Sequence, residues 1–102
     1  MLRERKESQT PLAMVTAYDS TFASIVDEAG VDLILVGDSV ATVMQGQRNT
    51  LGVSMQDMEY HVRLVASVKP NALIVGDMPF GSYQSSVKDA VDNAVRLVKA
   101  GA

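Results

Sequence analysis

The sequence of 102 residues contains no cysteine, no tryptophan and a single histidine. Without cysteine there is no disulfide, no thiolate nucleophile and no thiolate metal site, which agrees with a reducing compartment. Long apolar runs are also missing, since no segment approaches the roughly twenty residues that a membrane-spanning helix needs. The first seven residues carry five charges in place of the apolar core of a signal peptide. We therefore expect a cytoplasmic protein with no membrane partner.

Positive charge is scarce as well. Nine Lys and Arg residues stand against twelve Asp and Glu residues, which leaves a formal net charge of -3, and the basic residues are scattered along the chain. A nucleic-acid surface needs basic residues gathered on one face, so no nucleic-acid partner is expected. The hydrophobic content of 47% and the charged content of 21% are typical of a globular domain. Residues 1–102 are accordingly read as one domain.

Two apolar runs end in the same way, with a glycine followed by an aspartate. Residues 31–39 finish in Gly-Asp-Ser, and residues 72–77 finish in Gly-Asp. The interval in sequence between the two aspartates leaves room for the loop and helix that connect consecutive parallel strands, since a strand-helix unit needs at least about thirty residues. Parallel strands place their carboxyl ends on one side of a sheet, so Asp38 and Asp77 should meet at one rim. Either aspartate alone is explained equally well as a helix cap, but the matched pair favours a site.

Short apolar runs alternate with segments of helical periodicity along the whole chain. Strands are predicted over residues 12–17, 31–36 and 72–76, and helices over residues 21–29, 55–68 and 86–100. Capping side chains precede the helices, namely Asp19 or Ser20, Ser54 in a capping box with Asp57, and Ser85 or Ser86. This order predicts an α/β fold made of the first three strand-helix units of a (β/α)8 TIM barrel, which is incomplete in this chain.

Two segments have no predicted regular structure. Residues 1–10 are expected to form an N-terminal cap or tail, and residues 40–53 a long rim loop of functional importance. The outer strands of so short a sheet have unpaired backbone groups, so we expect a homo-oligomer. The predicted apolar helix faces are Phe22, Ile25, Val26 and Ala29; Met55, Met58, Val62, Val65 and Ala66; and Val87, Ala90, Val91, Ala94, Val95 and Val98.

Six short motifs, taken in order, make the comparison with one family specific. They are VTAYD at 15–19, VGDS at 36–39, QG at 45–46, TL at 50–51, YH at 60–61 and DMPFGSY at 77–83. Together they resemble the N-terminal part of ketopantoate hydroxymethyltransferase, the 3-methyl-2-oxobutanoate hydroxymethyltransferase of pantothenate synthesis. The resemblance covers nearly the whole chain from Pro11 onward. It implies a (β/α)8 barrel that binds Mg²⁺ and assembles as a large oligomer.

The resemblance also implies roles for individual residues. Asp38 and Asp77 would be Mg²⁺ ligands, directly or through water, and Asp38, Ser39 and Asp77 would bind the α-keto acid. Carboxylates without cysteine or nearby histidine are hard oxygen donors of the kind that Mg²⁺ prefers. The implied reaction moves a hydroxymethyl group from 5,10-methylenetetrahydrofolate to 3-methyl-2-oxobutanoate and gives 2-dehydropantoate. The general base is expected beyond Ala102, so no catalytic residue is assigned here and the chain alone is expected to be inactive.

The sequence departs from the family pattern at two positions, and two other functions are alternatives to this one. Gln47 stands where the family often has histidine, and Gly52 where it often has proline, so folate contacts or loop rigidity differ here. His61 is assigned to packing or to the surface, and packing is also the default for Tyr18, although its position at a strand end puts the site within reach. The alternatives are a Mg²⁺-dependent barrel of the phosphoenolpyruvate mutase or lyase type and a noncatalytic oligomerisation fragment.

Overall fold

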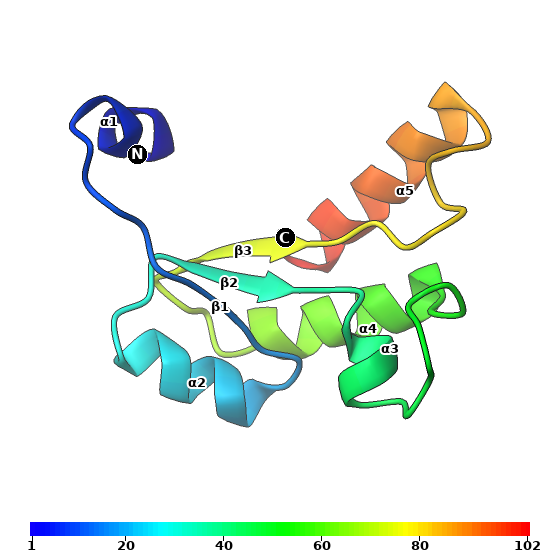
Figure 1. Cartoon of the computed structure of the whole chain (residues 1–102), viewed down its shortest axis with the longest axis horizontal. Helices are drawn as coiled ribbons and strands as arrows, with labels where there is room; N and C mark the ends of the chain where they lie inside the picture. The colour runs from blue at the N-terminus through cyan, green and yellow to red at the C-terminus, as the bar shows by residue number, and fades with distance from the viewer.

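Three parallel strands, each paired with the next along the chain, form the centre of the molecule (Figure 1). The computed structural model describes all 102 residues. The strands are β1 (Met14–Thr16), β2 (Leu33–Val36) and β3 (Leu73–Gly76), and Met14, Leu33 and Leu73 stand side by side in the register. The predicted α/β class is confirmed, and the three predicted strands are present but shorter than the apolar runs.

Five helices connect and flank the strands: α1 (Leu2–Glu7), α2 (Ser20–Glu28), α3 (Val40–Val43), α4 (Met55–Ala66) and α5 (Val87–Ala100). The caps predicted from the sequence explain where the three longer helices begin. Asp19 caps α2, Ser54 and Asp57 form the capping box of α4, and Ser86 accepts the backbone N–H of Asp89 in α5. None of the helices combines the length and the apolar character needed to cross a membrane.

The core lies between the sheet and the helices on one of its faces. Alternate residues of β2, Ile34 and Val36, are fully buried and belong to one cluster with Met58, Val62 and Val65 of α4. Figure 1 shows α2 and α4 together on this side of the sheet. The face predicted for α4 is therefore correct.

The opposite face of the sheet has no covering layer within this chain. Met14 and Leu73 point to that face beside Leu33 and are 53% and 44% exposed. The predicted faces of α2 and α5 are partly uncovered as well, since Phe22 is 59% exposed and Val87 is 81% exposed. Apolar surface of this extent indicates a place for further structure or for another chain.

Two short helices lie in segments for which no helix was predicted. Residues 1–10 contain α1, which sits apart from the helix layer at the amino ends of the strands (Figure 1). The long rim segment begins with α3, whose Val40 and Ala41 are fully buried. Valine and threonine have low helix propensity, so the sequence pattern did not predict this turn of helix. Its packing against the core stabilises it.

Candidate functional site

The carboxyl ends of the three strands bring the predicted site residues together. The Asp38 N–H, just past β2, donates to Oδ2 of Asp77 at 3.0 Å, and the Asp77 N–H donates to the Val36 carbonyl at 3.0 Å. Asp38 and Asp77 are both partly buried. The two aspartates thus occupy one rim, as the repeated Gly-Asp ending predicts.

Gly37 permits this close approach. A Cβ atom at this position would lie 3.0 Å from Oγ of Ser39 and 3.4 Å from Oδ2 of Asp77. A larger residue would therefore press on the Ser39 hydroxyl and lie in ordinary contact with Asp77, so glycine has a packing reason at this strand end.

Ser39 is oriented by a residue from the neighbouring strand. Its Oγ lies 2.7 Å from the Tyr18 hydroxyl, and it makes no capping bond to the start of α3. The default assignment of Tyr18 to packing is thus incomplete, because its hydroxyl reaches the site. The signal in the sequence was the position of a tyrosine directly after a strand, but nothing local indicated Ser39 as its partner.

The donors at this rim suit a hard cation. Oδ2 of Asp77 accepts the Asp38 N–H, whereas the other Asp77 oxygen and both oxygens of the Asp38 carboxylate accept no hydrogen bond within the chain. No group of three or more acidic, histidine or cysteine side chains is placed to hold a metal ion. Two carboxylates with free oxygens fit Mg²⁺, which keeps several waters and needs only one or two protein carboxylates.

An apolar hollow of about 310 Å³ opens next to these residues. It lies between the end of β1, the start of α2 and α3, and its lining is Thr16, Ala17, Tyr18, Asp19, Phe22, Val43 and Met44. Tyr18 therefore borders the hollow, and its hydroxyl reaches the polar site. This combination suits a ligand with a polar head and an apolar part.

The rim loop contains the two departures from the family pattern, and they lie in contact. Oε1 of Gln47 is 2.5 Å from the point where a Cβ atom of residue 52 would be, so a side chain at this position would displace the flexible end of Gln47. The amide of Gln47 also donates to Oε1 of Gln45 at 2.6 Å. The two positions that depart from the expected family pattern are therefore neighbours in the fold.

A capping hydrogen bond and an ion pair stabilise the helices around the rim. The Ser54 N–H, with the Gln45 side chain, holds the pKa of Asp57 below its usual value. Arg96 of α5 donates to both carboxylate oxygens of Glu59 in α4, at 2.9 and 2.7 Å, and the guanidinium holds the pKa of Glu59 below its usual value. These contacts fix the frame and leave the site aspartates free.

Comparison with known proteins covers the whole chain. The model of a family described as ketopantoate hydroxymethyltransferase matches residues 1–102. A 3-methyl-2-oxobutanoate hydroxymethyltransferase from Methylobacillus flagellatus is 52% identical over 101 residues, which are 99% of this chain and 38% of that protein. Proteins of the same name from Ignicoccus hospitalis and Thermococcus kodakarensis are 60% and 53% identical over 91 residues, which are 89% of this chain and 35% and 32% of theirs. The chain thus spans less than two fifths of the length of these relatives.

Proposed function

Because the chain belongs to the ketopantoate hydroxymethyltransferase family, we propose that it supplies one part of an active site that converts 3-methyl-2-oxobutanoate to 2-dehydropantoate. The hydroxymethyl group would come from 5,10-methylenetetrahydrofolate. The observation that carries the proposal is the 3.0 Å bond between the Asp38 N–H and Oδ2 of Asp77, which joins the ends of two adjacent strands. The carboxyl ends of parallel strands are where barrel enzymes carry their chemistry.

We also propose that the sheet is part of a (β/α)8 barrel. Three features support this: the strands pair in chain order, α2 and α4 lie on one face, and the open face presents apolar side chains such as Met14 and Leu73. The interior of such a barrel is filled by layers of side chains from its strands. In the complete protein, further strands would cover this face and the edges of β1 and β3.

In this proposal Asp38 and Asp77 hold Mg²⁺ at the rim. When bound, the ion supplies a Lewis acid that stabilises negative charge on the keto oxygen of the substrate. The Asp38 N–H holds one Asp77 oxygen in place, so that carboxylate cannot turn away. The Ser39 hydroxyl, held by Tyr18, would donate a hydrogen bond to the keto acid.

The reaction also needs a base, which we place outside this chain. A proton must leave the carbon beside the carbonyl before that carbon bonds to the one-carbon unit, and water then cleaves the bond to the folate nitrogen. A base must come within hydrogen-bond reach of that proton. Asp38 and Asp77 are assigned to the cation, and His61 forms its hydrogen bond with the Tyr18 carbonyl and none with Asp38, Ser39 or Asp77. We therefore propose that the chain alone does not transfer hydroxymethyl groups.

A chimera tests the function directly. Residues 1–102 would replace the matching segment of the Methylobacillus relative, with which they are 52% identical, and the formation of 2-dehydropantoate would be measured with Mg²⁺ and the folate. We expect turnover by the chimera and none by the chain alone. A chimera that folds but forms no product, while the parent relative does, would contradict the proposed function.

Exchange of the substrate proton for deuterium, followed by NMR, tests where the base lies. We expect the chain with Mg²⁺ to exchange the proton of 3-methyl-2-oxobutanoate no faster than Mg²⁺ alone. Exchange well above that control would place a base within these residues, and the assignment of the base to another part of the protein would be wrong.

A noncatalytic association module is the second candidate, and the surface of α5 favours it. Val87, Val91, Val95 and Val98 form an exposed stripe, whereas α5 packs into the core through Leu97. We propose that copies of the chain associate through such surfaces, which agrees with a cytoplasmic homo-oligomer. Sedimentation of the chain should show concentration-dependent association, and a stable monomer at high concentration would contradict it. An association module, unlike the enzyme, has no need of Mg²⁺.

A further inference from the structure

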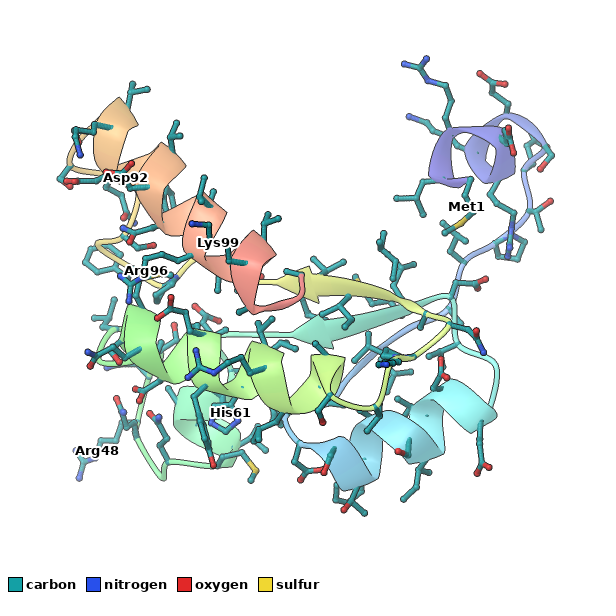
Figure 2. All side chains as sticks on the ribbon, turned by 180° about the vertical axis from the view of Figure 1, so that it is seen from behind. Met1, Arg48, His61, Asp92, Arg96 and Lys99 are labelled. Carbon is teal, nitrogen blue, oxygen red and sulfur yellow. The ribbon has the colours of Figure 1, made fainter.

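The only histidine contacts the residue that completes the candidate site. His61 lies in the second turn of α4 and is partly buried, on the side of the helix away from α5 (Figure 2). Its Nδ1 is 2.7 Å from the carbonyl oxygen of Tyr18. A carbonyl oxygen only accepts hydrogen bonds, so Nδ1 must be the donor. The contact therefore selects one tautomer of the neutral imidazole.

The Tyr18 carbonyl lies beyond the hydrogen-bond ladder of the sheet. The last ladder bond at this end runs from the Ala17 N–H to the Leu35 carbonyl at 3.1 Å. After Tyr18 the chain turns into α2, whose cap is Asp19. His61 thus supplies the partner that a neighbouring strand would otherwise provide, and it ties the end of β1 to α4.

His61 also contacts the Tyr18 ring. The two rings meet edge to face, with 6.4 Å between their centroids and an interplanar angle of 83°. Tyr60 packs against the imidazole in a similar way, with 5.3 Å between centroids. The imidazole is therefore held by aromatic contacts while it holds Tyr18 at both backbone and ring.

We infer that His61 is a positioning residue, which holds Tyr18 so that the Tyr18 hydroxyl orients the hydroxyl of Ser39 beside Asp38 and Asp77. The phenol oxygen lies at the far end of the side chain, so a small rotation of the Tyr18 peptide is enlarged before it reaches Ser39. The 2.7 Å contact between Tyr18 and Ser39 tolerates little displacement. The role of Ser39 toward a keto acid rests on the proposed function, but the link from His61 to Ser39 does not.

The test compares substitutions that retain or move the donor. In His61→Asn the amide nitrogen falls close to the position of Nδ1, whereas in His61→Gln it falls close to Nε2. Glutamine has the higher helix propensity, so a purely structural role predicts that the Gln variant is the better tolerated. Positioning through Nδ1 predicts instead that the Asn variant is the better tolerated. The exposed Gln56 on the same helix gives a matched control, Gln56→Ala.

The measurement is the rotamer of Ser39 in the ligand-free chain, from the three-bond couplings between its Hα and Hβ protons. We expect one dominant rotamer in the parent chain, in Gln56→Ala and in His61→Asn. We expect averaged couplings in His61→Gln, and also in Tyr18→Phe, which keeps the imidazole contact but lacks the hydroxyl. Unchanged couplings in His61→Gln, or equal averaging in both His61 variants, would overturn the inference.

Binding of the keto acid is measured separately, with the substitutions made in the chimera with the Methylobacillus relative. With Mg²⁺ present, we expect His61→Gln to bind 3-methyl-2-oxobutanoate roughly tenfold more weakly than His61→Asn, which corresponds to the loss of one oriented hydrogen bond. If the Ser39 rotamers are as expected but no variant binds the keto acid, the proposed function is contradicted and the positioning role of His61 stays intact. Binding that is equal in the two variants, with equal rotamers, would contradict the positioning role alone.

Discussion

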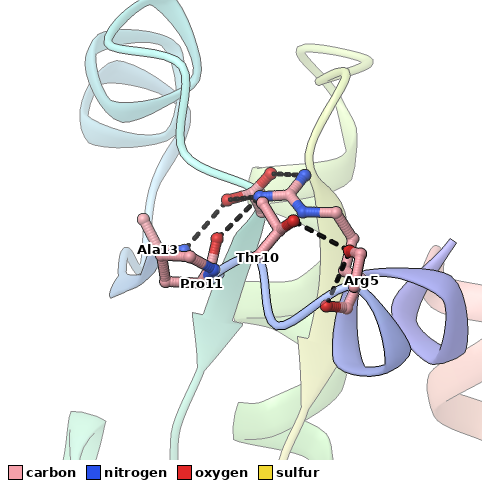
Figure 3. Close-up of polar contacts among 6 residues, drawn as sticks. Arg5, Thr10, Pro11 and Ala13 are labelled. Atoms are coloured by element: carbon pink, nitrogen blue, oxygen red, sulfur yellow. Dashed lines mark hydrogen bonds and ion pairs between the residues drawn. The ribbon is translucent and has the colours of Figure 1, made fainter.

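The two ends of the sheet use their aspartates differently. At the amino ends, Asp32 accepts the Ala13 N–H at 2.9 Å and pairs with Arg5, which also donates to the Pro11 carbonyl (Figure 3). Asp27 accepts backbone N–H groups of residues 71 and 72, ahead of β3, at 3.2 and 2.9 Å. At the carboxyl ends, the Asp38 carboxylate accepts no hydrogen bond within the chain and Asp77 accepts one.

If the proposed function holds, this difference separates stability from function. Carboxylates that accept backbone N–H groups satisfy donors at strand ends and stabilise the fold. Carboxylates that keep free oxygens at a partly buried rim remain available to a cation or substrate. In parallel barrels, the carboxyl-end face holds the chemistry and the opposite face contributes stability. The three predictions that follow substitute aspartates at the two ends, and the first two compare the response of one end with that of the other.

The largest effect is expected from Asp77→Asn in the chimera. An amide is a much poorer ligand for Mg²⁺ than a carboxylate, so metal binding should weaken and turnover should fall by orders of magnitude. Asp27→Asn is the matched control at the amino end and should retain most of the turnover per folded molecule. Unchanged metal affinity and rate in Asp77→Asn would remove this residue from the site.

A smaller effect, on stability alone, is expected from Asp27→Asn. The substitution weakens the acceptor of two backbone N–H groups, which should lower the free energy of unfolding by about 1–3 kcal/mol. Urea unfolding of the two chains measures the difference, and cation binding measured on the folded chains should be equal. A loss of cation binding in the folded variant would break the division between the two ends.

The smallest effect is expected on the pH dependence of stability in the Asp32→Asn variant. The Ala13 N–H, together with Arg5, holds the pKa of Asp32 below the reference value of 3.8. Since the folded pKa is the lower one, the stabilisation is present in full above the unfolded pKa and is lost as pH falls through the folded value. The stability gap between the parent chain and Asp32→Asn should therefore be constant near neutrality and shrink below about pH 4. A stability gap that grew on acidification would contradict the lowered pKa of Asp32 in the folded chain.

The sequence was informative where local patterns decide structure. The Gly-Asp endings located two strands and the rim that Asp38 and Asp77 share, and the Ser54 and Asp57 pair located the start of α4. These features are local because caps and strand ends use neighbours in the chain. Helix α3 was missed because valine and threonine, which make up three of its four residues, have low helix propensity, and the burial of Val40 and Ala41 that favours it is not visible in the sequence.

Apart from the rim that Asp38 and Asp77 share, contacts between residues far apart in the chain could not be predicted. The bond from Tyr18 to Ser39, the imidazole contact of His61 and the backbone bonds of Asp27 each join different elements. No spacing rule indicates such partners, because they depend on how the elements pack. The exposed valine stripe of α5 had the predicted period, but the period could not show that it has no cover within this chain.

Titration of the chain with Mn²⁺, a paramagnetic substitute for Mg²⁺, tests the cation site most directly. Backbone amide spectra would be followed as the metal is added, because resonances broaden according to their distance from the bound ion. We expect Asp38, Ser39 and Asp77 to broaden first, the residues around Asp27 and Asp32 to stay sharp, and excess Mg²⁺ to reverse the effect. Broadening centred on the amino ends of the strands, or none in excess of a diamagnetic control, would contradict the assignment of the cation site to Asp38 and Asp77.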